Sequence, residues 1–333
     1  MRHKFIRRPL ALLVAAALCL TALPGCQQSA AKIINSVSCT VPSDGTPIKN
    51  HELFMREDAA VLPHEEAPSQ ETASAADQTE SGTTADTADT PADSNAAGSA
   101  APAASTMTQL HQTIQGKVSS YGGVWSVYVK RLDTGESFVI NDGPMVAASL
   151  IKLYVYGAIG QAELSGQIAP GAYNGTLSPM ITVSDNYSCN LLIDVLGKST
   201  INQFIQNQGY WNTVLNRKML SGEPVENYTS VSECGRLLEQ VYYGTYVSAD
   251  LSARLLQDLR NQTRCWKIPA GLPGGVASAN KTGELADVEN DVAIVYGPSC
   301  TYILCVMSDG VAPGIAQSNI IDISSTVYYA LNG

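Results

Sequence analysis

Between residues 107 and 333, sequence typical of β-strands occurs at both ends and sequence typical of helices lies between them, which restricts the folds open to the chain. Near the start, residues 124–129 and 137–140 are rich in apolar, β-branched and aromatic residues and flank a turn, so they predict a β-hairpin. Near the end, residues 291–307 predict two further strands, whereas the stretch from about 147 to 259 favours helices. A sheet must therefore combine both ends of this region, with the helical middle inserted as a lobe.

Two more helices are expected outside this middle stretch. Leu110, Ile114 and Val118 recur at helical spacing before the hairpin, and apolar positions recur over residues 315–331 after the last strand. We therefore expect an α+β domain, with an antiparallel sheet of about five strands flanked by helices and an inserted all-helical lobe. A cleft is expected where the lobe meets the sheet, because ligand sites favour such junctions.

The beginning of the chain predicts export. Basic residues precede an apolar run, Leu10 to Leu23, which is shorter than the roughly 20 residues that span a bilayer and is typical of a secretory signal. The sequence Leu23-Pro24-Gly25-Cys26 then resembles a bacterial lipobox, in which the signal is cut before a lipid-bearing cysteine. We therefore expect residues 1–25 to be a lipoprotein signal peptide. Lipid on Cys26 would anchor the protein to the bacterial cell membrane, outside the cytoplasm.

The segments that follow predict a spacer. Residues 26–64 show no assignable pattern and are interpreted as an N-terminal tether. Residues 65–106 contain eight acidic residues, no basic or aromatic residue and no Val, Ile, Leu or Met. Such a segment cannot bury enough apolar surface to offset the entropy lost on ordering, so we expect a disordered acidic linker before a domain at 107–333.

Charge and residue usage exclude two classes of function. The net charge of −10 argues against nucleic-acid binding, which needs clustered Lys and Arg. His111 is the one histidine of residues 107–333, and the usual clusters of Cys and His ligands are missing. We therefore expect neither a metal site nor another cofactor.

Six cysteines follow the lipobox, and outside the cytoplasm they permit up to three disulfides. Cys189 and Cys234 both fall in the predicted helical lobe, where they either form a bridge or remain small buried thiols. Cys300 and Cys305 are predicted to lie on one strand and to face opposite sides, so we do not expect them to pair with each other.

A serine and a lysine stand one helical turn apart in Ala147-Ala148-Ser149-Leu150-Ile151-Lys152. If a helix begins near Ser149, Lys152 lies on the same face and can reach the serine hydroxyl. A serine hydroxyl becomes a good nucleophile when a base takes its proton, and the amino end of a helix supplies N–H groups for an oxyanion. Alone, the motif is explained more simply by a helix cap and a lysine that extends to solvent.

Two further motifs follow in order and change this interpretation. Ser184-Asp185-Asn186 stands in the helical middle, and Lys281-Thr282-Gly283 stands just before a late strand. The ordered set resembles the serine β-lactamases and penicillin-binding proteins. The surroundings of the three motifs are similar to the class A subgroup: Ala148 to Lys152, Asn190, and the run from Lys267 to Pro273. The resemblance covers roughly residues 125–309 and implies the β-lactamase/transpeptidase-like version of the predicted fold.

The resemblance also implies a role for each motif residue. Ser149 would be acylated, Lys152 would take its proton, and Ser184 would pass a proton to the leaving nitrogen. The N–H groups of Ser149 and Glu284 would form the oxyanion hole. Substrate contacts are implied for Asn186, Lys281, Thr282, Gly283, Glu284 and Lys267. The implied partner is a β-lactam or a cell-wall peptide, and we expect a monomer.

The sequence departs from the class A pattern where relatives carry the glutamate that activates the deacylating water. Glu223 echoes that loop and is a candidate base, whereas Glu226 is expected to pair with Arg217 and close the loop, unless both glutamates are simply solvated. Glu284 replaces a residue that is mostly small in relatives, and its carboxylate would repel an anionic substrate. We expect β-lactam hydrolysis through an acyl-enzyme. The alternatives are a penicillin-binding-type peptide hydrolase with slow deacylation and a non-catalytic lipoprotein that binds a ligand.

Overall fold

The computed structural model describes residues 105–333. The predicted signal peptide, the lipidated Cys26, the tether and all but the last two residues of the acidic linker lie outside these residues and stay predictions. Of those two residues, Ser105 caps the first helix by accepting a hydrogen bond from the Thr108 N–H, and Thr106 begins it.

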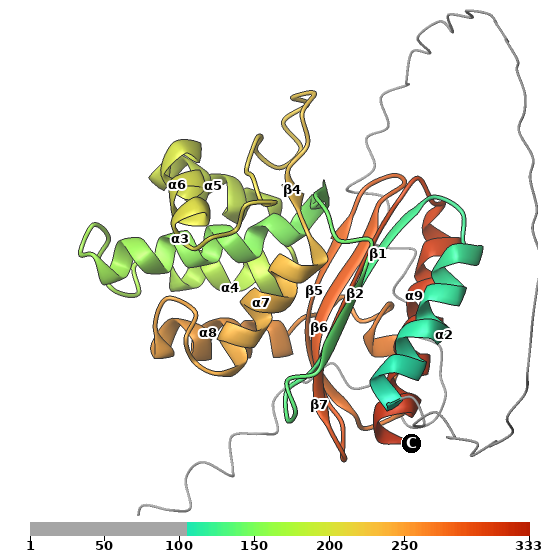
Figure 1. Ribbon diagram of the computed structural model, residues 1–333. Coiled ribbons are helices and arrows are strands. Elements are labelled where there is room, and N and C mark those ends of the chain that lie inside the picture. Colours follow the sequence, from blue (N-terminus) through green and yellow to red (C-terminus); the bar gives the residue numbers. More distant parts are fainter. Residues whose placement is uncertain (1–104) are drawn as a thin grey trace, which may run out of the picture. The chain divides into compact units, whose positions relative to one another are not determined.

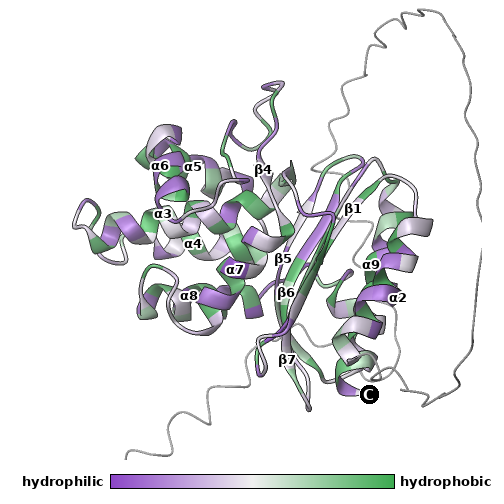
Figure 2. Cartoon of the chain, viewed as in Figure 1, coloured by the Kyte–Doolittle hydropathy of each residue, from purple (hydrophilic) through white to green (hydrophobic). Residues whose placement is uncertain are grey.

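The centre of the described region is a five-stranded antiparallel sheet in the order β2-β1-β7-β6-β5. The first two strands come from the start of the region and the other three from its end (Figure 1), which confirms the predicted sheet. The strand bounds are β1 Val124–Arg131, β2 Ser137–Ile140, β5 Ala277–Glu284, β6 Glu289–Tyr296 and β7 Thr301–Asp309. Strands β6 and β7 are almost entirely buried and largely apolar (Figure 2), because helices cover both faces of the sheet.

Two helices from opposite ends of the region cover one face of the sheet: α2, Thr106–Ser120, and α9, Pro313–Asn332 (Figure 1). The apolar positions that predicted α2 are its buried ones. They pack with Trp125 of β1 and Ile320 of α9 in one continuous apolar cluster.

The other face is covered by the predicted helical lobe. Its elements are η1 Ala148–Ile151, α3 Lys152–Leu164, α4 Asn174–Thr182, α5 Asn186–Leu196, α6 Lys198–Asn207, α7 Val231–Tyr242 and α8 Ala249–Arg260. A short ladder of β3, Met145–Val146, with β4, Tyr228–Thr229, joins the lobe to the nucleophile segment, and a 3-10 turn, η2, covers Pro269–Gly271.

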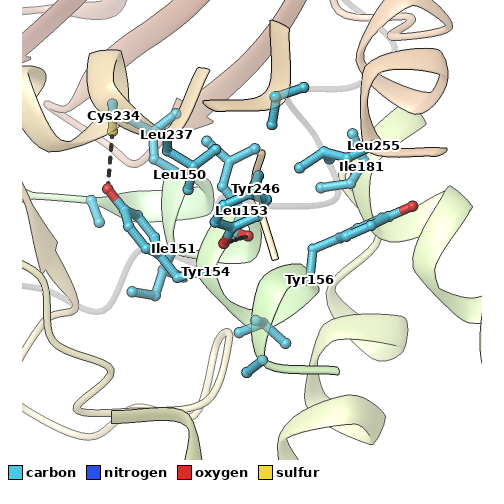
Figure 3. Close-up of a cluster of buried hydrophobic side chains, with 14 of the residues drawn as sticks. Leu150, Ile151, Leu153, Tyr154, Tyr156, Ile181, Cys234, Leu237, Tyr246 and Leu255 are labelled. Atoms are coloured by element: carbon cyan, nitrogen blue, oxygen red, sulfur yellow. Dashed lines mark hydrogen bonds between the residues drawn. The ribbon is translucent and has the colours of Figure 1, made fainter. Parts of the chain in front are cut away.

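Helix α3 forms the axis of the lobe and is buried on nearly all sides. Tyr154 and Tyr156 project from it into packed apolar side chains (Figure 3). The Tyr154 hydroxyl lies 3.7 Å from the Cys234 sulfur. A central helix of this kind fixes both the position and the direction of its first residue, which is Lys152.

The cysteines of the lobe do not form the bridge that the sequence permitted. Cys189 and Cys234 are buried free thiols, and so are Cys300 and Cys305. Burial raises the pKa of both lobe thiols to about 11. Cys265, in contrast, is disulfide-bonded.

The sequence interpretation missed strand β5. It placed Lys281-Thr282-Gly283 before a strand, whereas these residues lie within β5. The reason is that this strand carries polar side chains at buried positions, with Asn280 and Lys281 fully buried. A strand that buries polar groups against partners does not show the apolar pattern used to recognise strands.

Residues 105–333 offer neither a membrane-spanning helix nor a cluster of metal ligands. Of the helices there, none combines the length and the apolar character that crossing a membrane requires. Across the same part of the chain, no group of three or more His, Cys, Asp or Glu is arranged to hold a metal ion.

Candidate active site

Ser149 lies in a strained turn at the entrance to the lobe. The α-helix does not begin at Ser149, as expected, but at Lys152, after the 3-10 turn η1. Ala148 has a φ of 45°, in a region that costs a non-glycine residue about 1 kcal/mol or more. Neighbouring amides hold the turn: Ala147 N–H donates to the Asn227 carbonyl at 2.7 Å, and Asn290 Nδ2 donates to the Val146 carbonyl at 2.9 Å. The strain is thus compensated by contacts of the two residues that precede Ala148.

The Lys152 amino group is fully buried and connects two of the motifs. Its Nζ lies 3.1 Å from Ser149 Oγ, 3.1 Å from Ser184 Oγ, 2.8 Å from Asn186 Oδ1 and 2.5 Å from the Ser184 carbonyl. A lysine in direct contact with a serine hydroxyl is placed to exchange a proton with it, which is the geometry that activates a serine nucleophile.

Ser184 is held between two lysines. Its hydroxyl accepts a hydrogen bond from Lys281 Nζ at 2.9 Å and lies 3.1 Å from Lys152 Nζ. Ser184 has a φ of 62°, and the next residue, Asp185, caps α5 by accepting from the Ser188 N–H at 2.6 Å. Burial lowers the pKa of Lys281 well below its usual value, and the nearby positive charge of Lys152 lowers it further. Three side chains therefore form a continuous path for proton exchange.

Strand β5 passes very close to the nucleophile turn because of Gly283. A Cβ atom at this position would lie 2.9 Å from the Ala147 carbonyl and 3.2 Å from the Ser149 nitrogen. Next to it, Thr282 is fully buried, and its Oγ1 has no hydrogen-bond partner within the described structure. The third motif thus supplies a backbone that approaches the serine.

An open cavity lies beside Ser149. Of the residues predicted from the sequence, Ser149, Asn186 and Glu284 line it. Its other lining residues are Ala148, Arg217, Met219, Leu220, Glu226, Asn227, Arg264 and Leu285. Lys267 is instead fully buried behind Glu284, so the structure does not place it in the cavity wall.

The structure does not bring Glu223 into the site. Its side chain is exposed and pairs with Lys198 at 3.1 Å, and this hydrogen bond is the main cause that lowers the pKa of Glu223. Glu226 pairs with Arg217, as expected from the sequence: its two oxygens accept hydrogen bonds from the Arg217 guanidinium, at 2.6 and 3.0 Å. The loop residues that line the cavity are Arg217, Met219, Leu220, Glu226 and Asn227. The sequence interpretation missed Met219 because nothing local distinguishes it from a core methionine.

Glu284 is not the isolated carboxylate that the sequence suggested. Its oxygens contact Arg264 NH1 at 3.0 Å and Lys267 Nζ at 2.8 Å, and Lys267 also contacts Glu289 at 2.8 Å. Burial by itself raises the pKa of Glu284, but Lys267 and Arg264 outweigh it and lower this pKa to about 2. The side chain is therefore an ionised member of a buried charge network.

Known structures show the same arrangement of helices and strands. PBP-A is 29% identical over 67% of this chain and 96% of its own, with a TM-score of 0.63. A variant of PBP-A, described as an acyl-enzyme complex with penicillin G, is 28% identical over the same shares, with a TM-score of 0.63. The TLA-1 extended-spectrum β-lactamase shares 17% identity over 69% of this chain and 100% of its own, with a TM-score of 0.64, and supports the fold alone.

The chain was also compared with curated proteins and with protein families. No curated protein matches the chain significantly. Residues 109–171 and 174–331, however, match the family described as "Beta-lactamase enzyme family". This match includes all three motifs around the cavity and covers most of the chain. The protein belongs to the β-lactamase enzyme family.

Proposed function

We propose that this protein is a serine hydrolase of the penicillin-binding type, in which Ser149 is acylated by β-lactams and by cell-wall peptides and is released slowly. The observation that carries the proposal is the contact of Lys152 Nζ with both Ser149 Oγ and Ser184 Oγ, each at 3.1 Å. A non-catalytic binding protein has no need for two buried lysines around one serine, because burying such charges is costly.

Acylation follows from this geometry. Ser149 Oγ attacks the amide carbonyl carbon while its proton passes to a neutral Lys152 Nζ. The oxygen of the tetrahedral intermediate accepts hydrogen bonds from the N–H groups of Ser149 and Glu284. When the C–N bond breaks, Ser184 gives its proton to the leaving nitrogen and regains one from Lys152. The lysine is again neutral, and the ester of Ser149 remains.

The cavity favours slow release of that ester. Water attacks an ester efficiently when a carboxylate takes its proton. The carboxylates that line the cavity are Glu226 and Glu284, and each is engaged by an arginine. The loop opposite contributes Met219 to the lining, and a thioether accepts no proton. We therefore favour a long-lived acyl-enzyme over the rapid β-lactam hydrolysis expected from the sequence.

The cellular location proposed from the N-terminal sequence suits an enzyme that acts on cell-wall peptides. A lipoprotein signal and lipid at Cys26 would hold the enzyme at the outer surface of the membrane, where cell-wall peptides are made and trimmed. Growth of cells in labelled palmitate would test the anchor, since Cys26→Ser must abolish labelling of the protein.

The test of the proposed function uses the full chain, a fluorescent penicillin and a chromogenic cephalosporin. We expect stoichiometric labelling that persists on a gel, with little colour formation, and no labelling of Ser149→Ala. Rapid turnover of the cephalosporin would instead establish a β-lactamase. Absence of both labelling and turnover would overturn the assignment to β-lactam-reactive enzymes.

A further inference from the structure

Each arginine on the wall of the cavity is paired with a carboxylate on the same wall. Arg217 makes a two-point contact with Glu226, and Arg264 contacts Glu284 at 3.0 Å. A paired arginine attracts a ligand anion weakly, because the charge of its partner cancels much of its field. The wall of the cavity is therefore close to neutral even though it carries four charged side chains.

The pair beside strand β5 is fixed more firmly than an ordinary surface pair. Glu284 and Arg264 are both mostly buried, with 14% and 13% of their side chains exposed. Behind Glu284, the fully buried Lys267 contacts it at 2.8 Å and also contacts Glu289 at 2.8 Å. Separating Glu284 from Arg264 would leave buried charges unmatched, so the carboxylate stays in place when a substrate enters.

A hydroxyl lies next to this fixed carboxylate. Thr282 and Glu284 are two residues apart on β5, and alternate residues of a strand project from the same face. The buried Thr282 Oγ1 has no partner among residues 105–333, although a buried hydroxyl normally has one. The hydroxyl is buried and does not line the cavity, so Glu284 and Arg264 are the groups that a ligand in this corner meets.

We propose that Glu284 determines substrate specificity by making this corner accept an uncharged carbonyl group, of an amide or ester, in preference to a free carboxylate. This inference rests on the proposed acylation of Ser149. A substrate carboxylate in the corner would lose its hydration without gaining a free cation, because Glu284 already occupies Arg264. An uncharged amide or ester carbonyl loses far less on leaving water, so the neutral corner accepts it more readily. The preferred peptide substrate is thus one whose chain continues as an amide beyond the cleaved bond.

The test compares a penicillin that has a free carboxylate with the methyl ester of the same compound. The full-length protein is incubated with each, and the second-order rate constant for acylation of Ser149 is measured by mass spectrometry. Each value is divided by the rate of alkaline hydrolysis of that compound, which corrects for chemical reactivity. We expect the corrected rate to be roughly tenfold or more higher for the ester, because only the acid must desolvate a charge beside an arginine that is already paired.

Two variants test whether Glu284 causes the preference for the ester. Glu284→Gln removes the charge and keeps the shape, so it must lower the ester-to-acid ratio at least severalfold. Glu223→Gln removes an exposed carboxylate outside the cavity and must leave the ratio unchanged. A wild-type ratio of one or below overturns the inference, even if Glu284→Gln does not fold. A ratio that persists in a folded Glu284→Gln protein overturns the role of Glu284. If neither compound acylates Ser149, the proposed function fails first and this inference fails with it.

Discussion

Asn190 binds both backbone polar groups of Met219. Its Oδ1 accepts from the Met219 N–H at 2.8 Å, and its Nδ2 donates to the Met219 carbonyl at 3.0 Å. This clamp joins helix α5 to the loop that forms one wall of the cavity, and it holds Met219 in that wall with Ser149. The side chain at position 219 therefore lies where it can influence the fate of an acyl group on the serine.

A carboxylate at position 219 should convert slow release into turnover. In Met219→Glu, the Asn190 clamp is kept because it involves only the backbone of residue 219, and the new carboxylate belongs to a residue of the cavity wall. We expect the rate of deacylation after penicillin labelling to rise by about 10²-fold or more, the usual contribution of a general base. Met219→Gln has the same shape without a base and should stay labelled. Equal deacylation rates in the two variants would contradict this role for the wall position.

Gly283 should be irreplaceable for acylation. Gly283→Ala places a methyl group 2.9 Å from the Ala147 carbonyl, so β5 must move away from the nucleophile turn. We expect the acylation rate constant to fall by at least about tenfold, because a displaced oxyanion donor stabilises the transition state poorly. Gly175→Ala in α4 meets no atom within 4 Å and serves as the control that retains normal acylation. Normal acylation of Gly283→Ala would show that the close approach is unnecessary.

The Arg217–Glu226 pair should stabilise the loop that carries Met219. Only 9% of the Arg217 side chain is exposed, and its guanidinium contacts both carboxylate oxygens. Urea denaturation of the single and double alanine variants should give a coupling free energy of about 1 kcal/mol or more, as expected for a charged two-point contact. The exposed pair of Lys198 and Glu223 should show no measurable coupling in the same experiment. Similar coupling in both pairs would contradict the importance of burial.

Asp291 should make stability depend on pH between about 4 and 7. Burial raises the pKa of Asp291 to about 7 from its usual 3.8, despite the nearby positive charge of Lys267. The folded state therefore binds this proton more tightly than the unfolded state. The resulting stabilisation is complete below pH 4 and is lost as the pH rises through 7.

The variant Asp291→Asn tests this dependence. Asparagine keeps an acceptor for the Ile268 N–H, which Asp291 binds at 2.9 Å, and does not ionise. Urea midpoints measured from pH 4.5 to 7.5 should decline more steeply for the wild type than for the variant. Parallel curves would show that Asp291 does not titrate in this range.

Many structural elements of this protein could be predicted from local sequence. The hairpin of β1 and β2 and the helices α2 and α9 could be predicted because their apolar spacing reflects one face packed on a core. The three motifs also predicted which residues lie near Ser149, since their contacts with Lys152 and Ser184 require side chains of those types. A sheet built from both ends of the region, with an inserted lobe, followed from the order of these segments.

Other features were decided only by contacts between distant parts of the chain. Strand β5 was missed because its polar side chains are buried against partners that the sequence does not place beside them. Met219 lines the cavity and Glu223 does not, because Asn190, 29 residues earlier, holds the backbone of the loop. The negative charge of Glu284 is compensated because Arg264 and Lys267 contact it from another segment of the chain. Local sequence therefore determined the elements and the reactive residue types. Tertiary packing determined which charges are compensated and which side chains face the serine, because both depend on distances between residues far apart in the chain.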